Sequence, residues 1–272
     1  MQKDHLGGCL VSYTRYFFYP YVVVLWPMST SFAFSRKQRL FVVLGFLFLT
    51  NALVAEFIGA KIFSLESSLG LAPAQWVIGG DVFNFDMTAG VILWPFVFIL
   101  TDLINEYYGK KGVKWLSYLA AGMLVYAFIA VRVAMNLDGA DFWLNSGQNQ
   151  GLNNMSQAFN AIFGQGLFII MGSLVAFLVG QLVDAFIFEK LKSQDQGNRI
   201  WVRATGSTLV SQLIDSYIVL VIAFWWGAGY PLKWVIQVGS LNYVYKVGMA
   251  LIMLPLLYGA HRLIDRYLGK EA

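Results

Sequence analysis

Long runs of apolar residues separated by short polar segments fill the chain from Leu40 to Tyr258. Each run holds about 20 residues, the length that a helix needs to cross the ~30 Å hydrocarbon core of a membrane. The runs are continuous and do not alternate as strands of a membrane barrel do, so they predict helices. We expect an all-α membrane protein with a bundle of six transmembrane helices at 40–58, 88–107, 113–135, 164–188, 204–226 and 238–258.

Composition supports this fold class. Hydrophobic residues make up 58% of the 272 residues and charged residues only 12%, against about 25% in soluble domains. The chain therefore lacks the charged shell of a soluble protein. Its net charge of +4 fits positively charged cytoplasmic loops better than a nucleic-acid partner.

Basic residues fall on one side of the six expected spans. Before the first span, between the second and third, between the fourth and fifth, and after the sixth lie Arg36, Lys37, Arg39, Lys110, Lys111, Lys114, Lys190, Lys192, Arg199, Arg203, Arg262, Arg266 and Lys270. The opposite loops hold Lys61, Arg132 and Lys233. By the positive-inside rule, both termini should be cytoplasmic and the protein should lie in the cytoplasmic (inner) membrane as a multi-pass protein.

We expect three segments: an N-terminal extension and cytoplasmic lead at 1–38, a transmembrane domain at 39–260 and a cytoplasmic tail at 261–272. The apolar stretch 16–26 is about half as long as a membrane span. Met28 precedes small polar residues, so we hypothesise that it is the true start; an interfacial anchor is the alternative. In the outer loop 136–163, the apolar end at 158–163 indicates either an amphipathic interfacial helix or a solvated loop.

Ionisable and amide side chains inside the expected spans are the candidate chemistry. A charged group there costs several kcal/mol or more and commonly faces a bundle interior or a water-filled cavity. The candidate substrate-binding residues are Glu56, Asp102, Asn105, Asp184, Gln212, Asp215 and Lys246.

Each candidate also has a plainer interpretation. Glu56 could reach the lipid headgroups, and Asp102 with Glu106 could extend to the cytoplasmic surface. Asp215 and Lys246 lie too deep for that, so their plainer interpretation is a structural ion pair with each other.

Asp184 could pair with Lys190 or Lys192 at the surface. Its helix nevertheless resembles the next one. Gln181 and Asp184 are three residues apart, as are Gln212 and Asp215, so each helix presents an amide and a carboxylate on one face. Such a pair can bind a planar heterocycle, because a carboxylate accepts two N–H donors and an amide both donates and accepts. Aromatic residues that could stack on such a ring are Phe186, Tyr217, Tyr243 and Tyr245.

The sequence lacks the motifs of several enzyme classes. The chain has no phosphate-binding GxxxxGKS sequence, no HExxH and no GxSxG. His5 and His261 lie outside the expected spans, so we expect no metal or cofactor. An intramembrane aspartyl protease would need two carboxylates at one depth, and the expected depths of Asp102, Asp184 and Asp215 differ. We therefore predict a transporter and no enzymatic activity.

Four strings of residues carry a family resemblance. They are Trp94–Lys110 (WPFVFILTDLINEYYGK), Gln181–Phe188 (QLVDAFIF), Arg203–Ser216 (RATGSTLVSQLIDS) and Tyr243–Lys246 (YVYK). In this order they resemble the signature of the queuosine precursor transporter family, also called the vitamin uptake transporter family. The resemblance covers about Leu40 to Tyr258.

This resemblance implies six helices, a place in the cytoplasmic membrane and uptake of 7-cyano- or 7-aminomethyl-7-deazaguanine. The expected partners are this small molecule and membrane lipid, with an oligomer or an unknown partner subunit left open. Two other functions also stay open. The chain could be a substrate-binding membrane subunit for a vitamin-like heterocycle that needs an ATPase partner, or an intramembrane enzyme that turns over without a gradient.

Overall fold

The structure is a computed structural model that describes residues 34–78, 80–148, 151–164, 167–194 and 200–269. The chain divides into the units Met1–Phe34 and Ser35–Ala272, and the second unit holds every element described below. The expectations for Met28 and for 16–26 lie outside the described residues. The expected domain boundaries at 38 and 260 stay predictions.

The first helix, α1, spans Arg36–Ile58 and confirms the expected span at 40–58 apart from an earlier start. Ser35 sets that start. Its hydroxyl accepts the backbone N–H of Gln38 at 3.2 Å, and the Gln38 side chain accepts the backbone N–H of Ser35 at 2.9 Å. This reciprocal cap satisfies two donors that the first turn leaves unpaired.

A long helix, α3, covers the second and third expected spans. It runs from Trp94 to Met135 after the 3-10 turn η1, Ala89–Ile92, but its backbone is not helical at Gly109 (φ 70°, ψ 177°). Glycine adopts positive φ without the steric cost of a Cβ atom. The break separates residues 94–108 from 110–135, close to the expected ranges 88–107 and 113–135. The second expected start was too early, since Thr88 still belongs to a strand.

The segment between α1 and η1 contains short strands that the apolar pattern did not indicate. Strand β1 (Ile62–Ser64) pairs antiparallel with β4 (Asp86–Thr88), and β2 (Trp76–Ile78) pairs antiparallel with β3 (Asp81–Phe83). One helical turn, α2 (Leu65–Ser68), follows β1. The fold is therefore helical within its apolar runs and not in this connection.

The carboxylate of Glu66 joins separate parts of the segment between α1 and η1 by hydrogen bonds. Glu66 is buried, and its Oε1 atom accepts the backbone N–H of Phe85 at 2.9 Å and that of Ala74 at 3.4 Å. The bond from Phe85 is the main reason that the pKa of Glu66 lies below its usual value, because N–H donors favour the charged carboxylate. The β2–β3 hairpin is also tied to the start of α8: Asp81 Oδ2 lies 2.9 Å from Lys233 Nζ and 3.0 Å from Gln237 Nε2. These contacts lower the pKa of Asp81.

Two short helices follow α3: α4 (Asp141–Leu144) and α5 (Met155–Phe163). Asn154 caps α5, because its Oδ1 atom accepts the backbone N–H of Ser156 at 2.8 Å. The apolar end of the outer loop thus forms a helix. Its place at a membrane surface stays a prediction.

The remaining helices are α6 (Leu167–Gln194), α7 (Ile200–Leu220) with the π-helical turn η3 (Val221–Trp226), α8 (Leu232–Ile252) and α9 (Leu254–Leu268). The fourth and fifth expected spans agree with α6 and with α7 plus η3.

The sixth expected span, 238–258, was misplaced. Helix α8 follows Pro231 and ends at Ile252, and Pro255 lies in the first turn of α9 instead of near the end of a span. Proline has no N–H to donate, which the first turn of a helix tolerates and the interior does not. Its ring therefore begins a new helix.

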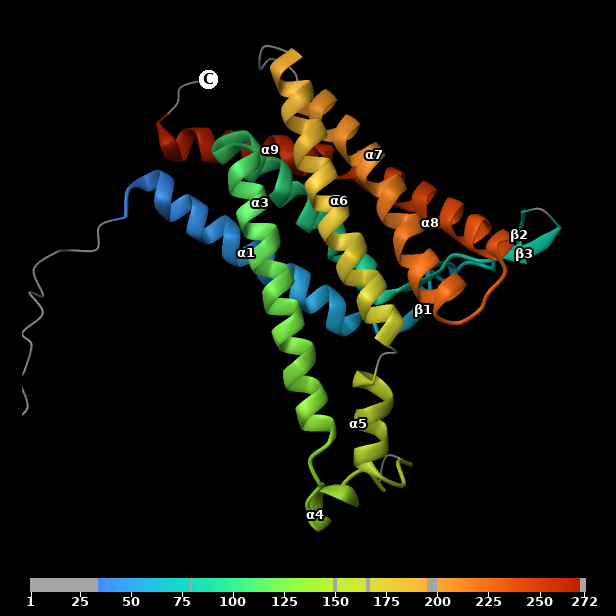
Figure 1. The fold of residues 1–272 in the computed structure, drawn as a ribbon. Coiled ribbons are helices and arrows are strands. Elements are labelled where there is room, and N and C mark those ends of the chain that lie inside the picture. The colour runs from blue at the N-terminus through green and yellow to red at the C-terminus, as the bar shows by residue number, and fades with distance from the viewer. Residues whose placement is uncertain (1–33, 79, 149–150, 165–166, 195–199, 270–272) are drawn as a thin grey trace, which may run out of the picture. The chain divides into compact units, whose positions relative to one another are not determined.

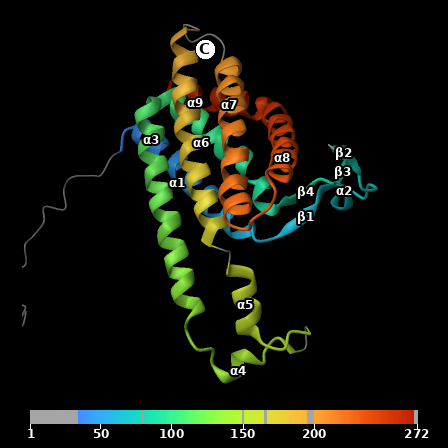
Figure 2. The same cartoon turned by 45° about the vertical axis from the view of Figure 1, so that its right-hand side comes forward.

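The helices pack around α3, α6 and α7. Helix α6 lies along both α3 and α7, α1 lies against α3, and α8 lies against α7 (Figures 1 and 2). Buried side chains such as Phe48, Val97, Leu103 and Phe188 fill the space between α1, α3, α6 and α7. This core holds the polar residues of α3, α6 and α7 in place.

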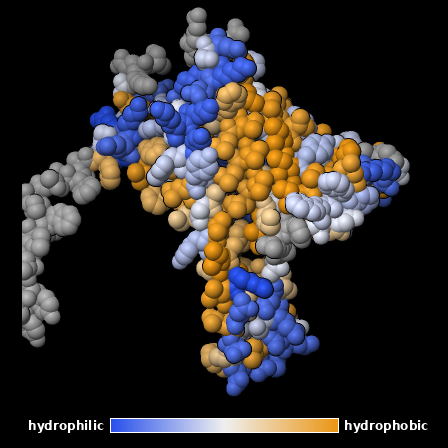
Figure 3. Space-filling model, viewed as in Figure 1, coloured by the Kyte–Doolittle hydropathy of each residue, from blue (hydrophilic) through white to orange (hydrophobic). Residues whose placement is uncertain are grey.

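Within the residues that the structure describes, five helical segments are long and apolar enough to cross a membrane: Arg36–Ile58, Trp94–Met135, Ile169–Gln194, Ile200–Trp226 and Leu232–Ile252. In Figure 3 hydrophobic residues cover the exposed face of α6 and the lower part of α3, and hydrophilic residues gather around α4 and α5. Apolar side chains exposed in this way suit contact with lipid. The chain is an all-α membrane protein by its spans, and the count of six depends on the break at Gly109.

Candidate functional site

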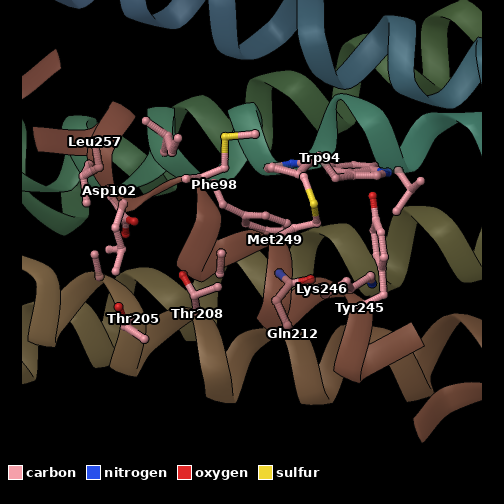
Figure 4. A pocket seen from close by; sticks show the side chains of 17 residues that line it. Trp94, Phe98, Asp102, Thr205, Thr208, Gln212, Tyr245, Lys246, Met249 and Leu257 are labelled. Carbon is pink, nitrogen blue, oxygen red and sulfur yellow. The ribbon is translucent and has the colours of Figure 1, made fainter. Parts of the chain in front are cut away.

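The candidate site is a pocket between α3, α7, α8 and the start of α9, with about 530 Å³ of empty space when its open mouth is included. Of this space, a cavity of about 40 Å³ admits a water-sized molecule, so the pocket is narrow. Its lining residues are Val91, Trp94, Pro95, Phe98, Ile99, Asp102, Ala204, Thr205, Thr208, Gln212, Tyr245, Lys246, Met249, Ala250, Met253, Leu254 and Leu257. The lining is mostly apolar, with a few polar groups among it (Figure 4).

Helical spacing explains which residues face the pocket. Trp94, Phe98 and Asp102 are four residues apart on α3, so they share one face. In Figure 4, Asp102 and Thr205 lie toward one end of the lining, Lys246 and Tyr245 lie toward the other, and Gln212 lies between them. A flat molecule in the pocket would therefore meet a carboxylate, an amide and an amine in turn.

Some of these polar groups have no hydrogen-bond partner within the part of the chain that the structure describes. Both amide atoms of Gln212 are buried and unpaired, as are Asp102 Oδ1 and Thr205 Oγ1. Gln212 is 1% exposed and Asp102 is 4% exposed. An unpaired buried polar group costs about 1–3 kcal/mol, so proteins rarely leave several of them together. Such a cluster beside a pocket is typical of a site that a polar ligand completes.

Asp215 and Lys246 form an ion pair between α7 and α8. The structural pairing that was the plainer interpretation of these two residues is therefore present. Lys246 also lines the pocket, whereas Asp215 does not. The pair consequently places the ammonium group of Lys246 at the pocket, and the carboxylate of Asp215, outside the lining, neutralises its charge.

Asn105 and Asp184 lie behind the pocket, between α3, α6 and α7. The side-chain amide of Asn105 donates to the carbonyl oxygen of Ala185 at 3.0 Å. Asp184 is fully buried, and its Oδ1 atom accepts the hydroxyl of Ser211 at 3.0 Å. Neither residue lines the pocket. The sequence predicted correctly that these two residues lie within membrane helices. In the structure their side chains bond to neighbouring helices instead of lining the pocket.

An ionic cluster forms where α6 ends and α7 begins. Lys192 pairs with Glu106 at 3.1 Å and not with Asp184, and Arg203 lies 2.8 Å from the same Glu106 oxygen. Arg203 is 2% exposed, whereas the Lys192 side chain is 34% exposed, so the cluster reaches from the surface into the interior. Asp102 is likewise buried, so its plainer interpretation, an extension to the cytoplasmic surface, does not hold.

Glu56 lies apart from the pocket, at the end of α1. It is buried and accepts a hydrogen bond from the Ser173 hydroxyl of α6. A buried carboxylate held by a neighbouring helix does not reach lipid headgroups. Glu56 therefore has an internal role, and the structure does not bring it into the pocket lining.

Of the four aromatic residues expected to stack on a heterocycle, Tyr245 lines the pocket. Phe186 is 53% exposed and has Lys110 4.3 Å from the centre of its ring, and the Tyr217 hydroxyl bonds to Ser240 at 2.9 Å. The aromatic rings that the sequence argument missed are Trp94 and Phe98. Phe98 and Trp94 precede Asp102 by four and eight residues, and this helical spacing could have indicated that they share its face.

Comparison with known proteins places the chain in a family. Residues 88–260, more than half of the chain, match the model of a family described as putative vitamin uptake transporter. No solved structure matches the chain.

Similar curated proteins include a probable queuosine precursor transporter of Bacillus subtilis, 27% identical over 186 residues, which cover 68% of this chain and 76% of the relative. The queuosine precursor transporter of Escherichia coli is 25% identical over 66% of this chain and 74% of the relative. A probable queuosine precursor transporter of Haemophilus influenzae is 24% identical over 65% and 69%, respectively.

The matched range contains the residues that line the pocket, from Val91 to Leu257. The family is one of transporters, which agrees with the apolar helices and excludes the enzyme alternative. A multi-pass place in the membrane follows from the same two observations, and the inner membrane is consistent with such a transporter. The chain thus belongs to the putative vitamin uptake transporter family and is a multi-pass membrane transporter.

Proposed function

We propose that this chain imports a queuosine precursor, 7-cyano- or 7-aminomethyl-7-deazaguanine, across the cytoplasmic membrane. The names of the relatives in three bacteria support this substrate class. The observation that carries the proposal is the pocket in which both amide atoms of Gln212 and one oxygen of Asp102 are buried without partners.

The chemistry of a deazaguanine suits these groups. Its base-pairing edge presents two adjacent N–H donors beside a carbonyl acceptor, and a carboxylate is a natural acceptor for such donors. The carboxylate of Asp102 would accept hydrogen bonds from the two N–H groups, and the Gln212 amide would bond to the carbonyl or to a ring nitrogen. Trp94, Phe98 and Tyr245 offer aromatic surface to the ring. A base that lacks the matching edge would leave these groups unpaired, which a buried site disfavours strongly.

The proposed function also requires a topology, that is, a number of spans and a side of the membrane for each terminus. If the break at Gly109 separates two membrane-spanning segments, the chain has six spans and both termini are cytoplasmic. Lys110, Lys111 and Lys114 follow the break directly, as the positive-inside rule requires of a cytoplasmic turn. The protein would then work by alternating access, with the pocket facing each side in turn.

The test is uptake in a bacterium that can neither make queuosine precursors nor import them. The full chain is expressed, a limiting amount of either deazaguanine is supplied, and queuosine in transfer RNA is read from its mobility shift. We expect modification to return with the wild-type chain and to be lost with Asp102→Asn. The matched control Asp86→Asn removes an exposed carboxylate of β4 and should behave as wild type.

Two results would contradict the proposal. Absence of queuosine, despite a chain that is present in the membrane, would remove the substrate assignment. Restoration that depends on a co-purifying ATPase would favour the alternative, a substrate-binding subunit of a larger system.

A further inference from the structure

Two buried carboxylates come from the facing helices α3 and α6: Asp102 lines the pocket and Asp184 lies behind it, and the proposed substrate binding uses Asp102 alone. Asp102 of α3 and Asp184 of α6 are 4% and 0% exposed. Each has one oxygen without a partner in the described part of the chain, Oδ1 of Asp102 and Oδ2 of Asp184. Their neighbours join the same turns of α3 and α6, because Thr101 bonds to Gln181 at 2.6 Å and Asn105 to the Ala185 carbonyl at 3.0 Å. Two like charges at close range in a buried site cannot both be stable without compensation.

The charged groups around the pair do not supply that compensation in full. Glu106 lies one helical turn from Asp102 on α3, and Lys192 and Arg203 both pair with Glu106 at 3.1 and 2.8 Å. Three carboxylates thus share two cations, so the cluster carries one negative charge when all five groups are ionised. One added positive charge would neutralise it.

The charged groups that α8 brings to the pocket and that α9 brings to Tyr107 have partners of their own. Lys246 of α8 pairs with Asp215. On α9, Asp265 accepts the Tyr107 hydroxyl at 2.8 Å, and His261 lies 2.7 Å from the same hydroxyl and 3.2 Å from Asp265. The excess charge therefore belongs to Asp102, Asp184 and Glu106, and Glu106 is held by its two cations.

We propose that Asp102 and Asp184 together hold one transported proton, which couples substrate uptake to the proton gradient. This inference rests on the proposed import of a deazaguanine. A proton needs one free oxygen, and Asp184 Oδ2 offers it. A metal ion would instead need several oxygen ligands around it.

The arrangement links the proton to the substrate. Asp102 lines the pocket and has to be ionised to accept two N–H groups, whereas Asp184 lies behind it. Substrate at Asp102 therefore favours the proton on Asp184, and a proton on Asp184 favours the ionised Asp102 that binds substrate. By linkage each raises the affinity for the other. Water that reaches the pair when the cytoplasmic side opens would stabilise both charges and release the proton inside.

The test uses the full chain reconstituted in lipid vesicles, with radiolabelled 7-cyano-7-deazaguanine and a pH-sensitive dye in the lumen. Three quantities are measured: exchange of labelled for unlabelled substrate with no gradient, uptake driven by an acidic exterior, and uptake driven by a sodium gradient. The variants are Asp184→Asn, whose amide oxygen can still accept the Ser211 hydroxyl, and the matched control Asp86→Asn.

For the wild type and the control we expect substrate to accumulate up to tenfold per unit of pH gradient, with one proton entering the lumen per substrate. We expect Asp184→Asn to retain exchange and to lose gradient-driven accumulation. Retained exchange shows that the variant is folded and that the pocket works.

Other results would overturn the proton assignment. Wild-type exchange without any response to the pH gradient would do so, as would uptake driven by sodium or full coupling in Asp184→Asn. If Asp184→Asn loses exchange as well, the proton flux that accompanies wild-type uptake decides alone. Absence of wild-type exchange of any deazaguanine would instead contradict the proposed function itself.

Discussion

The helices α6 and α7 carry the same short pattern and use it differently. In α6, Gln181 accepts the Thr101 hydroxyl of α3 at 2.6 Å, and Asp184 accepts the Ser211 hydroxyl of α7 at 3.0 Å. In α7, Gln212 has no partner for its amide and lines the pocket, while Asp215 pairs with Lys246 of α8. An identical spacing therefore gives one amide that holds two helices together and one that is free for a ligand.

The cause of this difference is position in the bundle. Helix α6 lies between α3 and α7 (Figure 2), so protein surrounds its polar face. Helix α7 has α6 on one side and the pocket on another, so Gln212 lies at the pocket, with no neighbouring side chain in the described part of the chain to bond its amide. A polar residue is structural where a neighbouring helix supplies its partner and available for binding where a cavity replaces that helix.

The largest effect on stability is expected at the ion pair. Asp215→Asn or Lys246→Gln alone should lower the free energy of unfolding in detergent by about 3 kcal/mol, because each leaves a partly buried charge unpaired. The double variant should recover much of that loss. Thermal unfolding of the purified proteins measures the coupling, and additive losses in the double variant would show that the pair is not structural.

The second prediction separates the two glutamines. Gln212→Leu should weaken substrate affinity about 30-fold, which corresponds to about 2 kcal/mol for two hydrogen bonds of ordinary strength. Gln181→Leu, its match in α6, should leave affinity within about threefold of wild type. Binding of labelled deazaguanine to purified protein measures both, and equal losses would contradict the division of roles between α6 and α7.

A smaller effect is expected on the stability of the Gln181 variant. Gln181→Leu removes the acceptor of the Thr101 hydroxyl, but that hydroxyl also lies 3.0 Å from the carbonyl oxygen of Val97. The free energy of unfolding should therefore fall by only about 1 kcal/mol. Chemical unfolding of Gln181→Leu beside Thr101→Val checks this value, and a loss of several kcal/mol would mean that Gln181 holds more than this one contact.

The smallest effect concerns a carboxylate outside the bundle, Glu66. Its pKa is lowered in the folded chain, so its contribution to stability is present above the unfolded value of about 4.5 and is lost as the pH falls through the lower folded value. The protection of the Phe85 amide against hydrogen exchange, relative to an unfolded chain at the same pH, should therefore fall at acidic pH below that range. Glu66→Gln should show faster exchange already at neutral pH, and an unchanged rate would contradict this role.

The sequence by itself determined the all-α membrane fold, the approximate place of most of its apolar helices and the residues worth testing. A lipid environment requires lipid-facing side chains to be apolar and the backbone to bond within each helix. Both requirements produce continuous apolar runs, which can be recognised in the sequence alone. Charged residues within the runs stand out for the same reason. The resemblance in the strings 94–110 and 203–216 was confirmed by the family match.

Only the tertiary structure decided which polar residues are partnered. The distinction between Gln181 and Gln212, the pairing of Lys192 with Glu106 and the seclusion of Asp184 all depend on which helix lies opposite, and no local pattern specifies that. The break at Gly109 and the start of α9 near Pro255 had visible signals, yet a glycine or proline permits a break without requiring it. Packing against neighbouring helices selects among these options, because it determines where a buried group can find a partner.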